Sequence, residues 1–397
     1  MSKGILDGVV VLDLTRVLAG PYCGMMLADM GATVYKIEQP KKGDDSRAFG
    51  PFINGESAYY MNLNRNKLGV TLNLKAPEGK EVFKKMVKKA DVVIENYRPG
   101  TMEKLGLGYE TLKEINPGIV YGCVSGFGHY GPYSQRAGYD IIGQAMGGLM
   151  STTGWPGGQP TRTGTAMGDV LGGLGCTIGV LAAVVNKIKT GEGQKVDVAL
   201  VDSVVSSLEI ITQIYLATGR IPERIGNRYE SAYPYDSFKA KDGDVIIGCG
   251  NDKLYKLLVE AMNQEELVND ERFATNALRV KNHELLKPII EEWTKKFEVD
   301  EIVEKLLNVG VPSSPINTID RVVKDPHIAV AREMFVEVEH PVAGKTTLTG
   351  EHIKFSDKKA EIRTPAPTLG QHNFNVYEDF IGLSEEIIKE YIDKGVF

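Results

Sequence analysis

The sequence predicts an α/β protein with a large domain around a parallel sheet and a second, smaller domain. Over the first third of the chain, short apolar segments alternate with amphipathic ones, which favours a parallel sheet with helices on both faces. After about residue 236 the pattern changes to helices with Lys/Glu faces, and these predict the smaller domain as far as about residue 325. The length of 397 residues also exceeds the usual size of one compact domain.

Apolar periodicity places the elements of the first third. The predicted strands are residues 9–14, 33–38, 70–74, 91–97 and 119–124. The predicted helices are residues 21–30, a helix that begins at Pro77, and residues 101–115. Proline suits the first turn of a helix, because the N–H that it lacks has no helical partner there.

A long apolar helix is predicted from residue 170 to residue 189, with glycines at positions 172, 173, 175 and 179. Each glycine inside a helix costs about 1 kcal/mol relative to alanine. Several in succession therefore indicate that another backbone or a ligand approaches this helix closely. A strand at residues 195–200 and a helix from about residue 202 follow.

Composition limits the class of protein. The chain is 42% hydrophobic and 25% charged, as in ordinary globular proteins, and its formal net charge of −6 argues against a general nucleic-acid binder. Residues 1–4 lead into the first strand without the apolar core of a signal peptide, and the apolar run at 170–185 is short for a membrane span. The cysteines are far apart, and no HExxH or similar histidine cluster occurs. We expect a cytoplasmic protein with reduced thiols, no catalytic metal and no membrane partner.

A dinucleotide site is disfavoured, although Glu38 ends the second predicted strand about where a ribose-binding acid would stand. The turn after the first strand reads TRVLAGPYCG and lacks the GxGxxG pattern, so no nicotinamide or flavin is expected. Cationic side chains gather in the same region, either as solvated surface charge or as a site for a phosphorylated cofactor. They are Lys36, Lys41, Lys42, Arg47, Arg65 and Lys67.

Asp169 is the candidate catalytic residue. It lies among small residues in TGTAMGDVLGGLG (163–175), directly before the long apolar run. One interpretation is a helix cap, since Asp at that place satisfies a free helical N–H. The other is a nucleophile: a helix N-terminus stabilises an ionised carboxylate, which can attack a thioester and form a mixed anhydride. The two interpretations are compatible.

Several segments in order resemble the family III coenzyme A transferases, the carnitine/formyl or CaiB–BaiF type, over essentially the whole chain. They are VLDLTRVLAGPYCGMMLADMGATVYKIEQPKKGDDSR (11–47), NRNKLGVTLNLKAPEGK (64–80), DVVIENYRPGTMEKLGLGYETL (91–112), GYDIIGQAMGGLMSTTG (138–154), GDVLGG (168–173), KTGEGQKVDVALVDS (189–203), GVPSSPIN (310–317) and TLGQH (368–372).

The resemblance implies an interlocked homodimer. Each chain would have a Rossmann-like large domain with a parallel sheet built from both chain ends (residues 1–225 and 326–397) and a small α+β domain (226–325). Asp169 would be the nucleophile, passing through an aspartyl anhydride and an aspartyl-CoA thioester, with coenzyme A as part of the substrate. The CoA contacts implied are Val17, Leu18, Gln39, Lys42, Leu74, Lys75, Asn96, Tyr97, Arg98, Lys104 and Arg136.

Two differences from the sequence patterns of related enzymes make two other reactions less expected. Acyl-CoA racemases of this fold carry a His–Asp pair where this chain has Tyr139–Asp140, so proton exchange at carbon would lose one of its two bases. The formyl-CoA:oxalate type has VQAGP in place of VLAGP and a glycine run that is missing here, which disfavours oxalate. Asp140 could position the neighbouring loop or a substrate.

The chain looks most like the succinyl-CoA and dicarboxylate branch. Arg16 and Arg47 could bind a distal carboxylate, or they could only support the CoA site. A carnitine-type substrate remains an alternative. Its quaternary ammonium would need an aromatic or acidic box. The tyrosines that could form such a box are Tyr59, Tyr60, Tyr133 and Tyr233.

Overall fold

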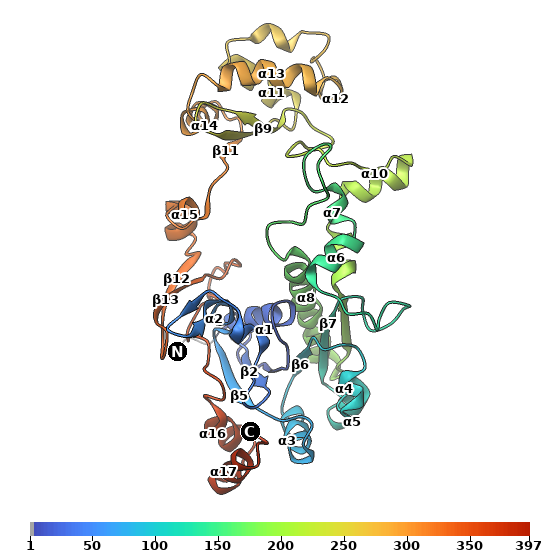
Figure 1. Ribbon diagram of the computed structural model, residues 1–397, viewed down its shortest axis with the longest axis vertical. Helices are drawn as coiled ribbons and strands as arrows, with labels where there is room; N and C mark the ends of the chain where they lie inside the picture. Colours follow the sequence, from blue (N-terminus) through green and yellow to red (C-terminus); the bar gives the residue numbers. More distant parts are fainter. Residues whose placement is uncertain (1–3) are drawn as a thin grey trace. The chain divides into compact units, whose positions relative to one another are not determined.

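The computed structural model describes residues 4–397 (Figure 1). Residues 1–3, with which the expected large domain begins, lie outside the described residues. The chain divides into two compact units: one holds the residues up to Leu149 with Arg162–Leu216 and Asp325–Phe397, and the other holds Met150–Thr161 and Ala217–Lys324. The second unit thus starts before residue 226 and includes a loop that we expected in the large domain.

The first unit contains a six-stranded sheet in the order β5-β2-β1-β6-β7-β8, with every neighbouring pair parallel. The predicted parallel α/β fold is confirmed. The strands are β1 (Val10–Asp13), β2 (Thr33–Glu38), β5 (Lys67–Thr71), β6 (Val92–Glu95), β7 (Val120–Ser125) and β8 (Lys195–Ala199).

The expectation that both chain ends build this sheet is wrong, because all six of its strands end before residue 200. The C-terminal return segment forms a separate antiparallel hairpin, β12 (Phe335–His340) with β13 (Gly344–Thr349). A short turn joins these strands, so they satisfy each other's backbone hydrogen bonds without the large sheet.

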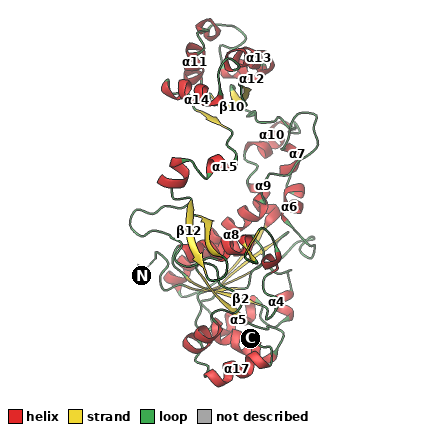
Figure 2. Ribbon diagram, turned by 60° about the vertical axis from the view of Figure 1, so that its left-hand side comes forward, coloured by secondary structure: helices red, strands yellow, loops and turns green. Residues whose placement is uncertain are grey.

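Helices cover both faces of the sheet, and each face has its own apolar core (Figure 2). Successive strand residues point to opposite faces. Leu12 packs with residues of α3 (Pro77–Val87), α5 (Tyr109–Ile115) and α17 (Glu385–Asp393). Val11 packs with residues of α1 (Ala19–Asp29), α2 (Ala58–Asn64) and α8 (Met167–Thr190). The shorter elements of this unit are β3 (Phe52–Ile53), β4 (Glu56–Ser57), α4 (Thr101–Lys104), α6 (Asp140–Met146), α9 (Leu200–Ser206), α10 (Ile210–Thr218) and α16 (Asn373–Asn375). The short helix α7 (Leu149–Thr152) belongs mostly to the second unit.

Two predicted elements differ from the structure. The helix expected at residues 101–115 is two helices, α4 and α5, because Gly106 adopts a left-handed φ of 72° and turns the chain so that Leu107 enters the core. The strand expected at 70–74 is β5, which begins at Lys67. Periodicity missed this start because Lys67, although charged, is buried and bonded to Asp13 at 2.8 Å.

The open edge of β5 is covered by residues from the far end of the chain. The Gly69 N–H donates to Nδ1 of His372 at 3.0 Å, and the Thr71 N–H donates to Oδ1 of Asn373 at 2.8 Å. In return, the His372 N–H donates to the Gly69 carbonyl, and the Tyr377 hydroxyl donates to the Thr71 carbonyl. Side chains of the return segment therefore take the place of a neighbouring strand.

The helix α8 has the length and hydropathy of a membrane-spanning segment, with a mean hydropathy of 1.8, and α9 with α10 would pass the same test only as one span bent by 75°. In the structure α8 packs against α1, β7 and α9, and 44% of its apolar window is buried. These contacts are those of a core helix in an α/β unit.

The second unit is α+β, as expected for the smaller domain. Its antiparallel sheet has the order β11-β10-β9 and packs on a helical layer. The strands are β9 (Tyr235–Lys239), β10 (Asp244–Gly248) and β11 (Ser313–Pro315). The helices are α11 (Asp252–Ala261), α12 (Asn276–Lys281), α13 (His283–Thr294), α14 (Val299–Asn308) and α15 (Ile319–Val322).

The glycines of α8 explain how closely it lies against its neighbours. A Cβ at Gly173 would stand 2.6 Å from the Ala19 carbonyl oxygen, so a backbone does approach α8, as the glycine pattern indicates. A Cβ at Gly175 would meet the Val198 side chain at 3.5 Å, which is ordinary contact.

These two glycines predict opposite mutational effects. Gly173→Ala should lower the free energy of unfolding by about 2 kcal/mol, because α1 backbone cannot move aside cheaply. Gly175→Ala should raise it by about 0.5 kcal/mol, because alanine favours helix and space is available. Urea denaturation followed by circular dichroism checks both, and effects of the same sign would contradict the packing described.

Candidate active site

The order of the strands reverses between β1 and β6, since β1 leads to β2 on one side while β6 pairs on the other. In open α/β sheets, ligands bind beyond the carboxyl ends of the strands at such a switch point. The loops after β1 and β6 are joined there: the Arg16 N–H donates to Oδ1 of Asn96 at 2.8 Å, and Nδ2 of Asn96 donates to the Arg16 carbonyl at 2.7 Å. These two hydrogen bonds tie the turn that contains Arg16, Val17 and Leu18 to the loop of Asn96.

A cavity of about 150 Å³ opens beside this junction, between the loops that follow β2, β5 and β6. Four of the expected CoA contacts line it together: Gln39, Leu74, Lys75 and Tyr97. The remaining wall comes from Ile37, Glu38, Leu72, Asn73, Thr101 and Leu105. The lining is mostly apolar with a few polar groups, which suits a flat ring system.

Other expected contacts lie on the surface outside this lining. Lys42 is exposed and pairs with Asp45 at 3.2 Å. Arg136 is exposed, and its guanidinium lies 3.6 Å from the centre of the Tyr133 ring. Arg98 follows β6, and Lys104 is exposed on α4. These four side chains do not line the cavity.

Asp169 lies inside the first turn of α8 and not at its cap. The helix begins at Met167, earlier than predicted, and its N-cap residue, Ala166, makes no side-chain capping bond. The interpretation of Asp169 as an N-cap is therefore wrong. Asp169 is instead an acidic residue of the first turn, where the helix N-terminus favours a negative charge.

Asp140 provides the missing cap from another helix. Its Oδ1 accepts from the Gly168 N–H at 2.8 Å and from the Asp169 N–H at 3.4 Å, while its Oδ2 accepts from Nε2 of Gln144 at 2.8 Å. Oε1 of Gln144 accepts from the Thr163 N–H at 3.0 Å. Asp140 and Gln144, both on α6, thus hold the first turn of α8 and the loop before it. Tyr139, the N-cap residue of α6, is 76% exposed.

The site makes Asp169 more basic than an ordinary carboxylate. Burial raises the pKa of Asp169 to about 7, and the Asp140 charge adds to this shift. Burial, followed by the charges of Asp169, Asp44 and Asp140, raises the pKa of Tyr59 to about 12, so its hydroxyl keeps its proton. For Asp169, burial therefore favours the protonated carboxyl group, whereas the helix N-terminus favours the ionised carboxylate. A more basic carboxylate is a stronger nucleophile once it has lost its proton.

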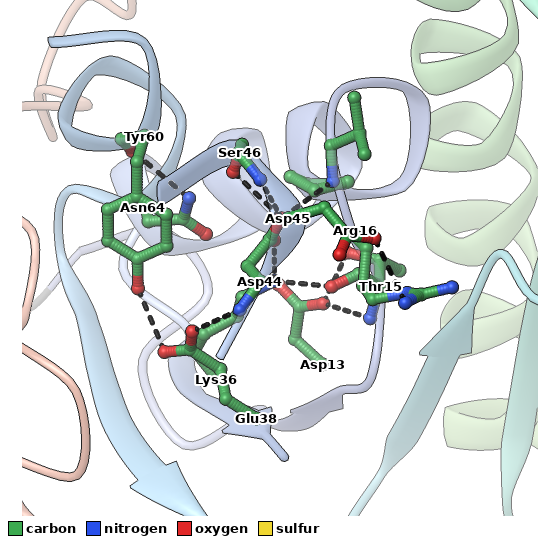
Figure 3. A network of polar contacts seen from close by, with 12 residues as sticks. Asp13, Thr15, Arg16, Lys36, Glu38, Asp44, Asp45, Ser46, Tyr60 and Asn64 are labelled. Atoms are coloured by element: carbon green, nitrogen blue, oxygen red, sulfur yellow. Dashed lines mark hydrogen bonds and ion pairs between the residues drawn. The ribbon is translucent and has the colours of Figure 1, made fainter. Parts of the chain in front are cut away.

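Several of the cationic side chains are structural. Lys36 pairs with Asp44 at 2.8 Å, Lys67 with Asp13 at 2.8 Å, and Arg65 with Asp29 at 2.8 Å. All three pairs are almost completely buried, so these cations cannot meet a phosphate. Figure 3 shows Asp13, Lys36 and Asp44 from these pairs, near the carboxyl ends of β1 and β2. Sequence periodicity did not predict these buried ion pairs, because a charged residue in a sequence cannot be recognised as buried until its partner is known.

The two arginines expected for a distal carboxylate differ. Arg47 donates to both carboxylate oxygens of Glu38, at 2.8 and 2.7 Å, and also to Tyr60 and the Pro367 carbonyl. This favours the alternative that Arg47 supports the CoA site. Arg16 makes one ion pair, with Asp45 at 3.0 Å, and 43% of its side chain is exposed.

Glu95, Cys123 and His129 place possible metal-ligand atoms within 4.8 Å of one another. However, Nζ of Lys195 lies 3.0 Å from Nδ1 of His129. An ammonium can only donate, so the proton of a neutral imidazole lies on Nε2, which faces Oε1 of Glu95 at 3.7 Å. This arrangement favours a His–Glu contact over a metal site. Glu95 also accepts from the Tyr97 N–H at 2.6 Å and so supports the loop after β6.

The structure thus combines a parallel α/β sheet, a cavity at its switch point and a carboxylate in the first turn of a helix. Comparison identifies the family, because residues 6–373 match the model of CoA-transferase family III. The chain belongs to that family and is an enzyme of the CoA-transferase class.

Named relatives span nearly the whole chain. The succinyl-CoA:glutarate CoA-transferase of Homo sapiens is 39% identical over 98% of this chain and 89% of its own length. The succinyl-CoA:mesaconate CoA-transferase of Haloarcula marismortui is 40% identical (95% and 96%), and the acetyl-CoA:oxalate CoA-transferase of Acetobacter aceti is 38% identical (95% and 96%). A crystal structure of a CAIB/BAIF family protein from Brucella suis has a TM-score of 0.84, at 39% identity over 95% of this chain and 100% of that one.

The raised pKa of Asp169 predicts the pH dependence of acylation. The value of kcat/KM should rise with pH and level off above about 7, because below that pH the attacking carboxylate is largely protonated. Asp140→Asn removes the neighbouring charge but keeps an oxygen for the Gly168 N–H. It should therefore move the midpoint to lower pH.

Asp197→Asn is the matched control, since Asp197 accepts from the His129 N–H and does not contribute to the Asp169 shift. Its midpoint should equal that of the wild type. A midpoint that Asp140→Asn leaves in place would contradict the assignment of the shift.

Proposed function

We propose that this chain moves CoA from succinyl-CoA or a similar short acyl-CoA to a short dicarboxylic acid, with Asp169 as covalent nucleophile. The observation that carries the proposal is the placement of Asp169: a partly buried carboxylate with a pKa of about 7, in the first turn of α8, whose first N–H groups are capped by Asp140. Chelation should leave the activity unchanged, because the proposed steps use this carboxylate alone.

The reaction has four acyl-transfer steps. An Asp169 oxygen attacks the thioester carbon of the donor, the C–S bond breaks, and an aspartyl anhydride and CoA thiolate form. The thiolate attacks the Asp169 carbonyl, which releases the donor acid and leaves an aspartyl-CoA thioester. The acceptor carboxylate attacks that thioester, giving a second anhydride and the thiolate. Finally the thiolate attacks the acceptor acyl carbon, which gives the new acyl-CoA and regenerates the Asp169 carboxylate.

The cavity beside β2 and β6 suits the adenine end of CoA. Gln39 and Tyr97 supply polar contacts at its mouth, and Leu74 supplies an apolar wall. We infer that the exposed cations Lys42, Arg98, Lys104 and Arg136 meet the phosphates or the pantetheine arm. The turn at Val17 and Leu18 would then lie along the path toward the thioester.

The choice of dicarboxylate rests on two supports. Similar relatives are named for glutarate and mesaconate, and Arg16 remains exposed enough to meet a distal carboxylate by a charge-assisted hydrogen bond. A panel of acceptors measured by mass spectrometry should rank such acids first. Oxalate belongs in the panel, because one similar relative is named for it.

The two alternatives fit less well. A racemase needs a second base near Asp169, and Tyr139 is an exposed phenol at the N-cap of α6. An aromatic box for a betaine is hard to assemble: Tyr60 is stacked and bonded by Arg47, Tyr133 is covered by Arg136, and Tyr233 belongs to the core of the second unit. Deuterium exchange at the α-carbon without an acceptor acid would indicate racemase activity.

We also infer a homodimer in the cytoplasm. The helices α6, α8 and α9 contact one another, and each exposes large apolar side chains: Ile141, Ile142, Met146, Ile178, Val185, Ile188 and Val205. On α8, Ile178 is 68% exposed and Ile188 is 77% exposed. A second copy of the chain would remove this surface from water. The free, buried cysteines fit a reducing compartment.

The covalent steps predict a trappable enzyme. Incubation with succinyl-CoA followed by borohydride or hydroxylamine should modify Asp169, because anhydride and thioester intermediates react with these reagents. Asp169→Asn should lose labelling and at least about 1,000-fold in kcat while keeping its circular dichroism spectrum. Asp202→Asn, on α9, is a control that should label normally. Labelling of another residue in the wild type would refute the mechanism.

The apolar surface predicts the oligomeric state. Light scattering coupled to size-exclusion chromatography should give the mass of two chains. Ile178→Glu with Ile188→Glu should weaken the dimer, because each change would bury a charge in the interface. The matched change Lys189→Glu, at an exposed residue of the same helix, alters the net charge by the same two units without adding charge to the apolar face. A wild-type monomer at micromolar concentration would contradict this inference.

A further inference from the structure

The turn after β1 contains a residue in an unfavourable conformation. Val17 has a left-handed φ of 69°, which a β-branched residue rarely adopts. Such conformations persist only where the surroundings over-determine them, and they gather at functional sites. The question is which groups hold Val17 in this state.

Three side chains from different parts of the chain hold the backbone of the turn, and Figure 3 shows two of them, Lys36 and Asp44. Nζ of Lys36, from β2, donates to the Thr15 carbonyl. Asn96, in the loop after β6, accepts from the Arg16 N–H and donates to the Arg16 carbonyl. Oδ1 of Asp44 accepts from the N–H of Val17 itself, at 3.1 Å.

Asp44 is itself rigidly held. Its carboxylate pairs with Lys36 at 2.8 Å and accepts from the backbone N–H and the hydroxyl of Ser46, at 2.9 and 2.8 Å. Its own N–H donates to Oε2 of Glu38 at 2.8 Å. Asp44 is 2% exposed, and Lys36 and Ser46 are fully buried. Burial opposes the charge of Asp44, but Lys36 and the Ser46 hydrogen bonds outweigh burial and keep the pKa of Asp44 below its ordinary value.

We propose that Asp44 is a positioning residue for CoA transfer, which fixes Val17 in its left-handed conformation so that the turn of residues 16–18 is already formed when the thioester arrives. This rests on the proposed function. Asp44 is buried and would not touch substrate. Its contribution is to remove the entropy cost of ordering the turn during binding, so its loss should weaken binding of acyl-CoA more than it slows chemistry.

A double-mutant cycle with Val17 tests the proposal. Asp44→Asn should raise KM for succinyl-CoA about tenfold and change kcat less than about threefold, with a matching loss of CoA affinity by calorimetry. Glycine adopts a positive φ without strain. In a Val17→Gly background, Asp44→Asn should therefore raise KM by about threefold or less.

Asp29→Asn is the matched control, because Asp29 is a buried aspartate paired with Arg65 that does not contact the turn. It should lower the melting temperature and leave KM unchanged. If Asp44→Asn does not fold, Ser46→Ala removes one hydrogen bond to Asp44, keeps its ion pair, and should raise KM about two- to fivefold.

An Asp44 substitution that lowers stability without changing KM overturns the proposal, as does an equal rise in KM with and without Val17→Gly. In the fallback arm, an unchanged KM for Ser46→Ala overturns it. Failure of the proposed function would look different: the wild type itself would transfer no CoA and Asp169 would not be labelled.

Discussion

The site depends on a group of charges buried at the carboxyl ends of β1 and β2. Asp13 and Asp44 face Lys67 and Lys36 in a region from which water is excluded. Removing one member of such a pair leaves a buried charge uncompensated, which is far more costly than losing a surface ion pair. Because each carboxylate also accepts hydrogen bonds from backbone or side chains of the adjoining loops, these pairs fix loop geometry as well as charge.

The same principle places the nucleophile. Asp169 stands in the first turn of α8, and the N–H groups at that end are satisfied by Asp140 from α6. A residue that caps its own helix would have its carboxylate engaged by the backbone. Moving the cap to a second helix leaves the Asp169 oxygens available for an acyl group. The proximity of two carboxylates also raises the pKa of Asp169, so the cap and the reactivity of the nucleophile are linked.

Apolar patterns were sufficient for the parallel sheet, the long glycine-bearing helix and the smaller α+β unit. Apolar patterns did not predict the elements in which charged residues are buried in the core. Lys67 begins β5 because Asp13 neutralises it inside the protein, and no periodicity reports that pairing. Within the site, Asp169 stood out by its small neighbours, and Gln39, Leu74, Lys75 and Tyr97 followed from the family resemblance. Asp44, Gln144 and Glu38 were missed in their supporting roles, because their partners lie on other elements.

The edge of β5 has a consequence for how the chain is made. The whole sheet and Asp169 are complete by Ala199, but the groups that close this edge, His372 and Asn373, are translated much later. An uncovered strand edge is a template for pairing with other chains. A nascent chain on the ribosome therefore carries a finished sheet with one exposed edge, which stays open to aggregation until His372 and Asn373 have been synthesised.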